Sequence, residues 1–287
     1  MAITAAPNAF NPQVWADLIQ ASFLGQVRVL PHALQDDTLV GKPGDTVTFP
    51  KWNTLTDLTQ LSEGVAMVPE AIDQTATKAT IAEFGKAVEY TDTRDLVGLG
   101  DVETEVVRQY GILAARAVDT SLITVAAAST AADAPNKIAA SAPLTYASSA
   151  GTGGTALTWP IITGAIAQFG DEWDPADFAG LFIRSDAQAK LFVDSQFTNA
   201  GALGAATPVA RGQIGTIAGL PVIVTDRLAA GKFMLLKRGA IGVLYKRRPI
   251  VEHDRDILKR TNVVTTNVHY AVKRLNDRGV CIGTLTA

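Results

Sequence analysis

Residues 41 to 49 read GKPGDTVTF, a dense turn signal followed at once by a strand of alternating polar and apolar side chains. A second strand pattern runs from Thr80 to Thr91, and the long stretch between the two has neither a helix nor a strand period. A compact domain seldom contains so long an irregular connection unless it is functional or disordered. Its composition is not that of a charged disordered linker. We therefore predict that residues 35 to 91 form an extended two-stranded arm whose edges are completed by another molecule.

Downstream of the arm, the clearest helix of the sequence runs from about Asp101 to Ser129. Acidic residues crowd its first turn, where the helix dipole favours negative charge. A helix of this length spans roughly 40 Å, so we expect a spine on which sheets pack. Its apolar stripe, spaced by three and four residues, is predicted to be Val102, Val106, Tyr110, Leu113 and Ala117, continuing through Ser121, Leu122 and Val125.

Upstream of the arm, a short helix is predicted from the N-cap Asn11 to a stop at Gly25. Its apolar side chains include Trp15 and Phe23. Two interpretations remain open for this stripe: it docks on the core of its own chain or on a neighbouring subunit.

The second half of the chain mixes helices and strands. Residues 130 to 158 are rich in Ala, Ser and Gly and indicate an internal boundary. Helices are expected from Thr158 to Phe169 and from Ser185 or Asp186. A Gly/Ala-rich stretch spans 199 to 215, and the alternating residues 264 to 273 are expected to close a long hairpin with 280 to 285. The remaining expected strands are 178 to 183, 219 to 224, 232 to 237 and 240 to 245.

The densest run of charges, residues 246 to 260, carries both signs along one extended segment. That pattern favours salt bridges to neighbouring subunits over a continuous track for phosphates, and a solvated edge without a partner is the alternative. Across the chain, the residues predicted to lie at inter-subunit contacts are Trp15, Phe23, Trp52, Glu63, Lys78, Arg247, Arg248, Glu252, Asp254 and Arg255.

Composition and motifs argue against an enzyme. The 287 residues are 47% hydrophobic and 18% charged, with a net charge of −3, which suits a folded chain with extra buried surface at subunit contacts. One cysteine and three separated histidines make a metal site improbable, and the nucleophile elbow and phosphate-binding loop are absent. No catalytic residue, cofactor or metal is expected, nor a secretory signal or a membrane span. A small α/β hydrolase or transferase is the alternative, and it would need a pocket with convergent polar groups.

The order of these elements resembles the Hong Kong 97-type capsid fold of tailed bacteriophages. The strings IAGLPVIVTD at 217 to 226, KRGA at 237 to 240 and YKRRPIVE at 245 to 252 are similar to the later part of many phage coat sequences. The resemblance implies an α+β fold whose Gly-rich loop near 200 to 214 lies towards the capsomer axis. Its parts would be an N-arm (1–34), an E-loop (35–91), a peripheral domain with the spine helix (92–147 and 240–287) and an axial domain (148–239).

By the same resemblance, the chain is expected to be a major capsid protein, located in the virion and assembled in the host cytoplasm. Pentamers and hexamers would form an icosahedral shell that encloses double-stranded DNA without sequence-specific binding. A scaffolding protein and a portal are implied; the scaffold is either a separate protein or an extension that has been removed, and a decoration protein is left open. Some relatives join subunits through a lysine–asparagine link, and Lys78 or Lys86 with Asn276 are the residues available for it, although nothing local identifies the pair. The alternative with the same fold is an encapsulin-like nanocompartment that holds a cargo enzyme.

Overall fold

The computed structural model describes residues 27–52, 55, 58, 60, 63–64, 66–72, 74–97, 101–129, 142–148, 156–192 and 216–285, with backbone alone at 49–52 and 74–77. The predicted N-terminal helix with Trp15 and Phe23 lies outside these residues, as does the whole Gly/Ala-rich stretch from 199 to 215. Trp52 is placed on a strand by its backbone only.

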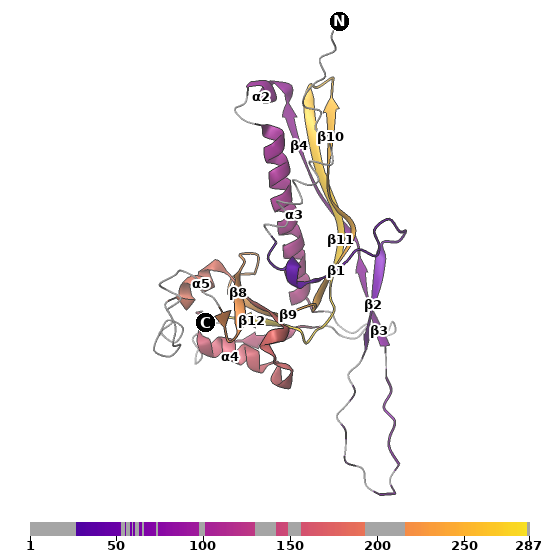
Figure 1. Cartoon of the computed structure of the whole chain (residues 1–287), viewed down its shortest axis with the longest axis vertical. Coiled ribbons are helices and arrows are strands. Elements are labelled where there is room, and N and C mark those ends of the chain that lie inside the picture. The colour runs from indigo at the N-terminus through magenta and orange to yellow at the C-terminus, as the bar shows by residue number, and fades with distance from the viewer. Residues whose placement is uncertain are drawn as a thin grey trace.

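A long helix and a four-stranded sheet form the upper part of the molecule in Figure 1. The helix is α3 (Val102–Ala127), and it lies along one face of the sheet. Strands β10, β11 and β4 are antiparallel neighbours, and β1 is parallel to β10. In sheet order the strands are β1 (Leu34–Asp36), β10 (Ile241–Asp256), β11 (Thr261–Arg274) and β4 (Ala82–Thr91).

The start of α3 is fixed by Asp101, whose Oδ1 accepts the backbone N–H groups of Glu103 (3.1 Å) and Thr104 (3.2 Å). Its fully covered face is rotated from the predicted stripe, because small residues and a carboxylate share it. Among the predicted positions, Tyr110 and Leu122 are buried, whereas Val102, Val106 and Leu113 are only partly buried. The buried residues are Val107, Tyr110, Gly111, Ala114, Ala115, Val118, Asp119, Leu122, Ile123 and Ala126.

The expectation that no segment could span a bilayer was wrong for α3. This helix is long and apolar enough by length and composition, and half of its most apolar window is buried in the fold. That burial is typical of a core helix, whose apolar face is needed against a sheet. It is weak evidence for a membrane span.

The second half of the chain builds a six-stranded sheet flanked by α4 (Trp159–Ala167) and α5 (Ser185–Leu191). All six residues of β6 are buried, as predicted for a central strand. Short 3-10 helices occur at Leu30–His32, Gly170–Glu172 and Pro175–Asp177. In sheet order the strands are β5 (Leu144–Ala147), β12 (Val280–Thr284), β9 (Lys232–Lys237), β6 (Phe178–Ile183), β8 (Leu220–Val224) and β7 (Thr216–Ile217).

The predicted closing hairpin is wrong. Strand β11 pairs with β10 and β4, whereas β12 pairs with β5 and β9 in the other sheet. The N–H groups of Leu275 and Asn276 both bond the carbonyl of Ala240, which turns the chain away from the first sheet. As a result β12, which the sequence assigned to the peripheral part, pairs with β9 of the predicted axial part, and β5 joins the same sheet through β12.

The predicted two-stranded arm is present, with a different second strand. Strands β2 (Thr46–Trp52) and β3 (Gln74–Thr80) form an antiparallel sheet of their own, beside the lower end of the four-stranded sheet (Figure 1). The pattern from Thr80 to Thr91 is β4, which pairs with β11 instead. A short unpredicted helix, α2 (Asp92–Val97), follows β4 and has no buried residue.

Candidate assembly surfaces

The base of the arm is attached to the body by a small apolar cluster. Ala79 of β3 is buried against Leu244 and Ala271, which belong to β10 and β11. Val47 of β2 packs on the same cluster. Because Val268 and Tyr270 pack with α3 and side chains alternate along a strand, Ala271 lies on the face of the sheet away from α3. The arm therefore rests on the sheet face opposite the spine helix.

The outer part of the arm exposes apolar side chains that nothing in the described chain covers. Glu63 is exposed in the turn with Gly64, and Lys78 is exposed on β3, so both predicted contact residues are accessible. An exposed apolar set of this kind marks a binding surface more often than a free surface. The arm-tip residues, as we call this set, are Leu55, Leu58, Met67, Val68 and Ile72.

A second exposed apolar surface lies at the end of the molecule remote from the arm (Figure 1). It comprises Leu96 and Val97 of α2 with Ile257 and Leu258 of the β10–β11 turn, and we call these four residues the end patch. Asp92 ties the two parts together, since its carboxylate contacts Arg255 (2.5 Å) and its N–H bonds the carbonyl of Arg260. The two segments that carry the end patch are thus held together at this end of the molecule.

The charged residues predicted to bridge subunits have partners within the described chain. Arg247 lies 3.2 Å from Glu252 and Arg248 lies 2.6 Å from Asp37. Asp254 accepts the N–H of Arg255, whose guanidinium contacts Asp92. These pairs are partly exposed and each contributes little to folding stability. Their role between subunits stays a prediction.

Acidic groups gather where α3 begins. Burial, together with Asp101 and Asp95, raises the pKa of Glu103 to about 7. His253 Nε2 of β10 lies 3.7 Å from this carboxylate. Burial, followed by the charges of Glu103 and the nearby aspartates, raises the pKa of Tyr90 to about 12. The contact between α3 and β10 at this end is therefore sensitive to pH near neutrality.

A buried carboxylate joins three parts of the fold, and no sequence pattern predicted it. Asp119 of α3 accepts the backbone N–H groups of Arg28 (2.7 Å), Val29 (3.2 Å) and Leu30 (3.2 Å). Arg227 Nη1, from the segment after β8, lies 3.3 Å from the same carboxylate. Burial raises the pKa of Asp119, and the N–H donors and Arg227 oppose that effect. A search for apolar periodicity passes over such a residue, because its partners lie far away in sequence.

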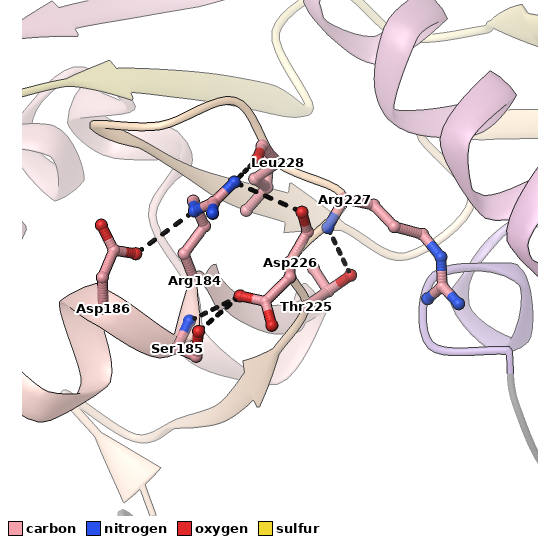
Figure 2. Close-up of polar contacts among 7 residues, drawn as sticks. All are labelled: Arg184, Ser185, Asp186, Thr225, Asp226, Arg227 and Leu228. Carbon is pink, nitrogen blue, oxygen red and sulfur yellow. Dashed lines mark hydrogen bonds and ion pairs between the residues drawn. The ribbon is translucent and has the colours of Figure 1, made fainter.

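The end of the IAGLPVIVTD string has a structural role that Figure 2 shows. Asp226 Oδ1 accepts the N–H (3.0 Å) and the hydroxyl (2.6 Å) of Ser185 at the start of α5, and these bonds lower the pKa of the Asp226 carboxyl. Arg184 donates to the carbonyls of Leu228 (2.7 Å) and Asp226 (3.3 Å). The Arg227 side chain points away from this group, towards Asp119. The segment after β8 therefore holds α5 on one side and the spine helix on the other.

The end of the spine helix is capped by a side chain of another element. Arg274 of β11 is almost fully buried, and its Nη1 donates to the carbonyls of Val125 (3.3 Å), Ala126 (2.8 Å) and Ala128. Its Nε contacts Asp277 at 2.7 Å. These bonds satisfy carbonyl groups that every helix end leaves unpaired.

The described residues offer no evident catalytic centre. Within them, no three His, Cys, Asp or Glu side chains gather to hold a metal ion. Cys281 is buried, and burial raises the pKa of its thiol to about 12, so it is a poor nucleophile. A cavity of about 200 Å³ is lined by Asp186, Ala187, Lys190, Gly231, Lys232 and Leu285, without a histidine, serine or cysteine.

Comparison with known proteins identifies the family of this chain. The family model described as phage capsid protein matches residues 74–283, well over half of the chain. The chain belongs to the phage capsid protein family. It is also 29% identical over 270 residues to the major capsid protein of Staphylococcus phage phiMR11. The aligned region covers 93% of this chain and 90% of the relative.

Solved phage capsids share the fold of this family member. The mature capsid of bacteriophage PhiM1 matches with a TM-score of 0.67 at 12% identity, over 100% of this chain and 90% of that chain. The capsid of cyanophage P-SCSP1u matches with a TM-score of 0.66 at 15% identity, over 88% and 86%. The predicted α+β fold of Hong Kong 97 type is confirmed. The family is one of structural proteins, so the interpretation as a capsid subunit and not an enzyme is confirmed as well.

Proposed function

We propose that this phage capsid protein is the major capsid protein of a tailed phage, closing as pentamers and hexamers into an icosahedral shell around double-stranded DNA. The observation that carries the proposal is the arm, whose exposed apolar tip residues have no cover within the described chain. Shell subunits need contacts on several sides. Each contact contributes a moderate binding free energy, and the closed symmetry of the shell repeats these contacts until the total is large. The arm tip and the end patch lie at opposite ends of the molecule, which suits this requirement.

The finer assignments belong to the same proposal. Residues 1–34 act as an N-arm, 35–91 contain the E-loop, and α3 with the four-stranded sheet forms the peripheral domain. The six-stranded sheet forms the axial domain, with β5 and β12 included because of their pairing. A scaffolding protein and a portal take part in assembly in the host cytoplasm, and the DNA is enclosed without sequence-specific contacts. The formal net charge of −3 supports the last point.

The arm provides the direct test. Replacing residues 53–73 by a short Gly-Ser turn removes the arm-tip residues and keeps β2, β3 and the buried Ala79. We expect a soluble, cooperatively folded subunit that forms no shells when its scaffold is supplied, as judged by sedimentation and electron microscopy. Gln60→Ser, at an exposed polar position of the arm, serves as the control and should assemble normally. Intact shells from the shortened arm would refute the proposal.

The encapsulin-like alternative has less support, because the matching family and the curated relative are both phage capsid proteins. The contents of purified particles separate the two functions. Nuclease-protected DNA is expected inside the particles, and a packaged enzyme in place of DNA would favour the alternative.

A further inference from the structure

Strand β10 is irregular in its middle. Its pairing with β11 shifts between Tyr245 and Arg247 and again between Arg247 and Ile250. Such bulges bend a strand and redirect side chains out of the regular alternation. Lys246 and Arg248 lie in this bulged segment, and both side chains reach residues 37 to 44, the connection that leads into the arm.

Lys246 holds the turn before the arm through two carbonyl groups. Its Nζ donates to the carbonyl oxygens of Lys42 and Gly44, the latter at 3.1 Å. Gly44 has φ +117 and Gly41 has φ +75, a region that favours glycine. The GKPGD turn therefore has a backbone shape that other residues adopt only with strain, and this shape presents two oxygens to one ammonium group.

Arg248 holds the beginning of the same connection. Its Nη2 lies 2.6 Å from Asp37 Oδ2, directly after β1. The guanidinium also lies over the ring of the buried Tyr245, 5.1 Å from its centroid, which restricts where the side chain can go. One bulged segment thus fixes both ends of the connection, at Asp37 and at Gly44.

We propose that residues 245–250 of β10 form a latch that sets the direction of the arm through Lys246 and Arg248. The inference rests on the proposed function, in which the arm contacts a neighbouring subunit. An arm already held in one direction loses less conformational freedom when it binds, so the latch favours assembly. Because the Arg248–Asp37 pair is exposed and Lys246 is only half-buried, each contact is weak enough for the arm to be redirected without unfolding the subunit.

The test measures the arm direction in unassembled subunits. Spin labels are placed at Thr48→Cys on β2 and Thr124→Cys on α3, both exposed positions, and the distance distribution is recorded. The single native cysteine, Cys281, is buried and should not react. Lys246→Met and Arg248→Met are each expected to broaden the distribution and to slow shell formation. Arg116→Met removes one positive charge from the exposed face of α3 and should leave the distribution unchanged.

Exchanging the charges of Asp37 and Arg248 separates the effect of their ion pair from any effect of altered side-chain packing. Asp37→Arg alone places two guanidinium groups together and should broaden the distribution, whereas Asp37→Arg with Arg248→Asp should narrow it again. Thermal melts confirm that each variant is folded. Unchanged distributions in the Lys246 and Arg248 variants would overturn the latch, and so would broadened distributions with wild-type assembly rates. If the unaltered subunit forms no shells, the proposed function fails. The distance distributions of the unassembled subunit would still show whether Lys246 and Arg248 set the direction of the arm.

Discussion

Arg227 Nη1 lies 3.3 Å from the carboxylate of Asp119, which is fully buried in the middle of the spine helix. The same carboxylate accepts three backbone N–H groups at residues 28 to 30. Asp119 is therefore the point where the N-terminal segment, α3 and the segment after β8 meet.

Replacing this carboxylate should destabilise the whole subunit. Asp119→Ala leaves Arg227 and three N–H groups without their acceptor, and breaking such a buried pair costs about 3 to 5 kcal/mol. Chemical denaturation of the purified subunit measures the loss. Asp186→Ala is the control, because its pair with Arg184 is exposed and should be worth under about 1 kcal/mol. Equal losses in the two variants would contradict the prediction.

Removing the cap at the end of α3 should loosen that end of the helix. Arg274→Met unpairs the carbonyls of Val125 and Ala126 and should cost about 1 to 3 kcal/mol. Hydrogen exchange should quicken over the last turn of α3, and denaturation gives the free energy. Arg278→Met removes an exposed arginine that pairs with Glu172, and exchange in α3 should not respond to it.

Stability should fall with rising pH through the titration of Glu103. Its pKa is raised from 4.5 to about 7, so the folded chain binds this proton more tightly than the unfolded chain. The stabilising contribution is complete below about pH 4.5 and is lost as the pH rises through about 7. Melting temperatures at pH 5 and pH 8 test this, since Glu103→Gln should remove that part of the difference. Asp95→Asn, which takes away one of the acids responsible, should move the transition to lower pH. An unaltered pH profile in both variants would contradict the assignment.

The end patch should matter for assembly and not for folding. Leu258 is 96% exposed, so Leu258→Asp should change the free energy of unfolding by less than about 0.5 kcal/mol. Shell yield should drop, because a charge would then lie at an apolar contact between subunits. Leu258→Met keeps the apolar character and should assemble normally. Normal yield from the aspartate variant would show that this patch stays exposed in the shell.

Local patterns were sufficient to predict most of the helices and strands. The acidic first turn and the spacing of apolar residues located α3, and the GKPGD turn located the start of the arm. The second strand of the arm is β3, whereas the strand predicted for this place is β4 and pairs with β11. The predicted closing hairpin does not form. The alternation of side chains along a strand predicts which face is apolar, but it does not predict which strand will pair with it.

The sequence by itself determined the order of elements, the exposed apolar character of the arm and the absence of the catalytic motifs sought. Those features depend on residues within a few positions of one another, and their physical cause is local backbone preference and side-chain periodicity. Only the tertiary structure decided the strand partners, the buried bonds of Asp119 and Arg274 and the contacts of Lys246 and Arg248 with the base of the arm. Each joins groups far apart in the chain, and each forms because the fold brings polar groups next to hydrogen-bonding partners that their own segments do not supply.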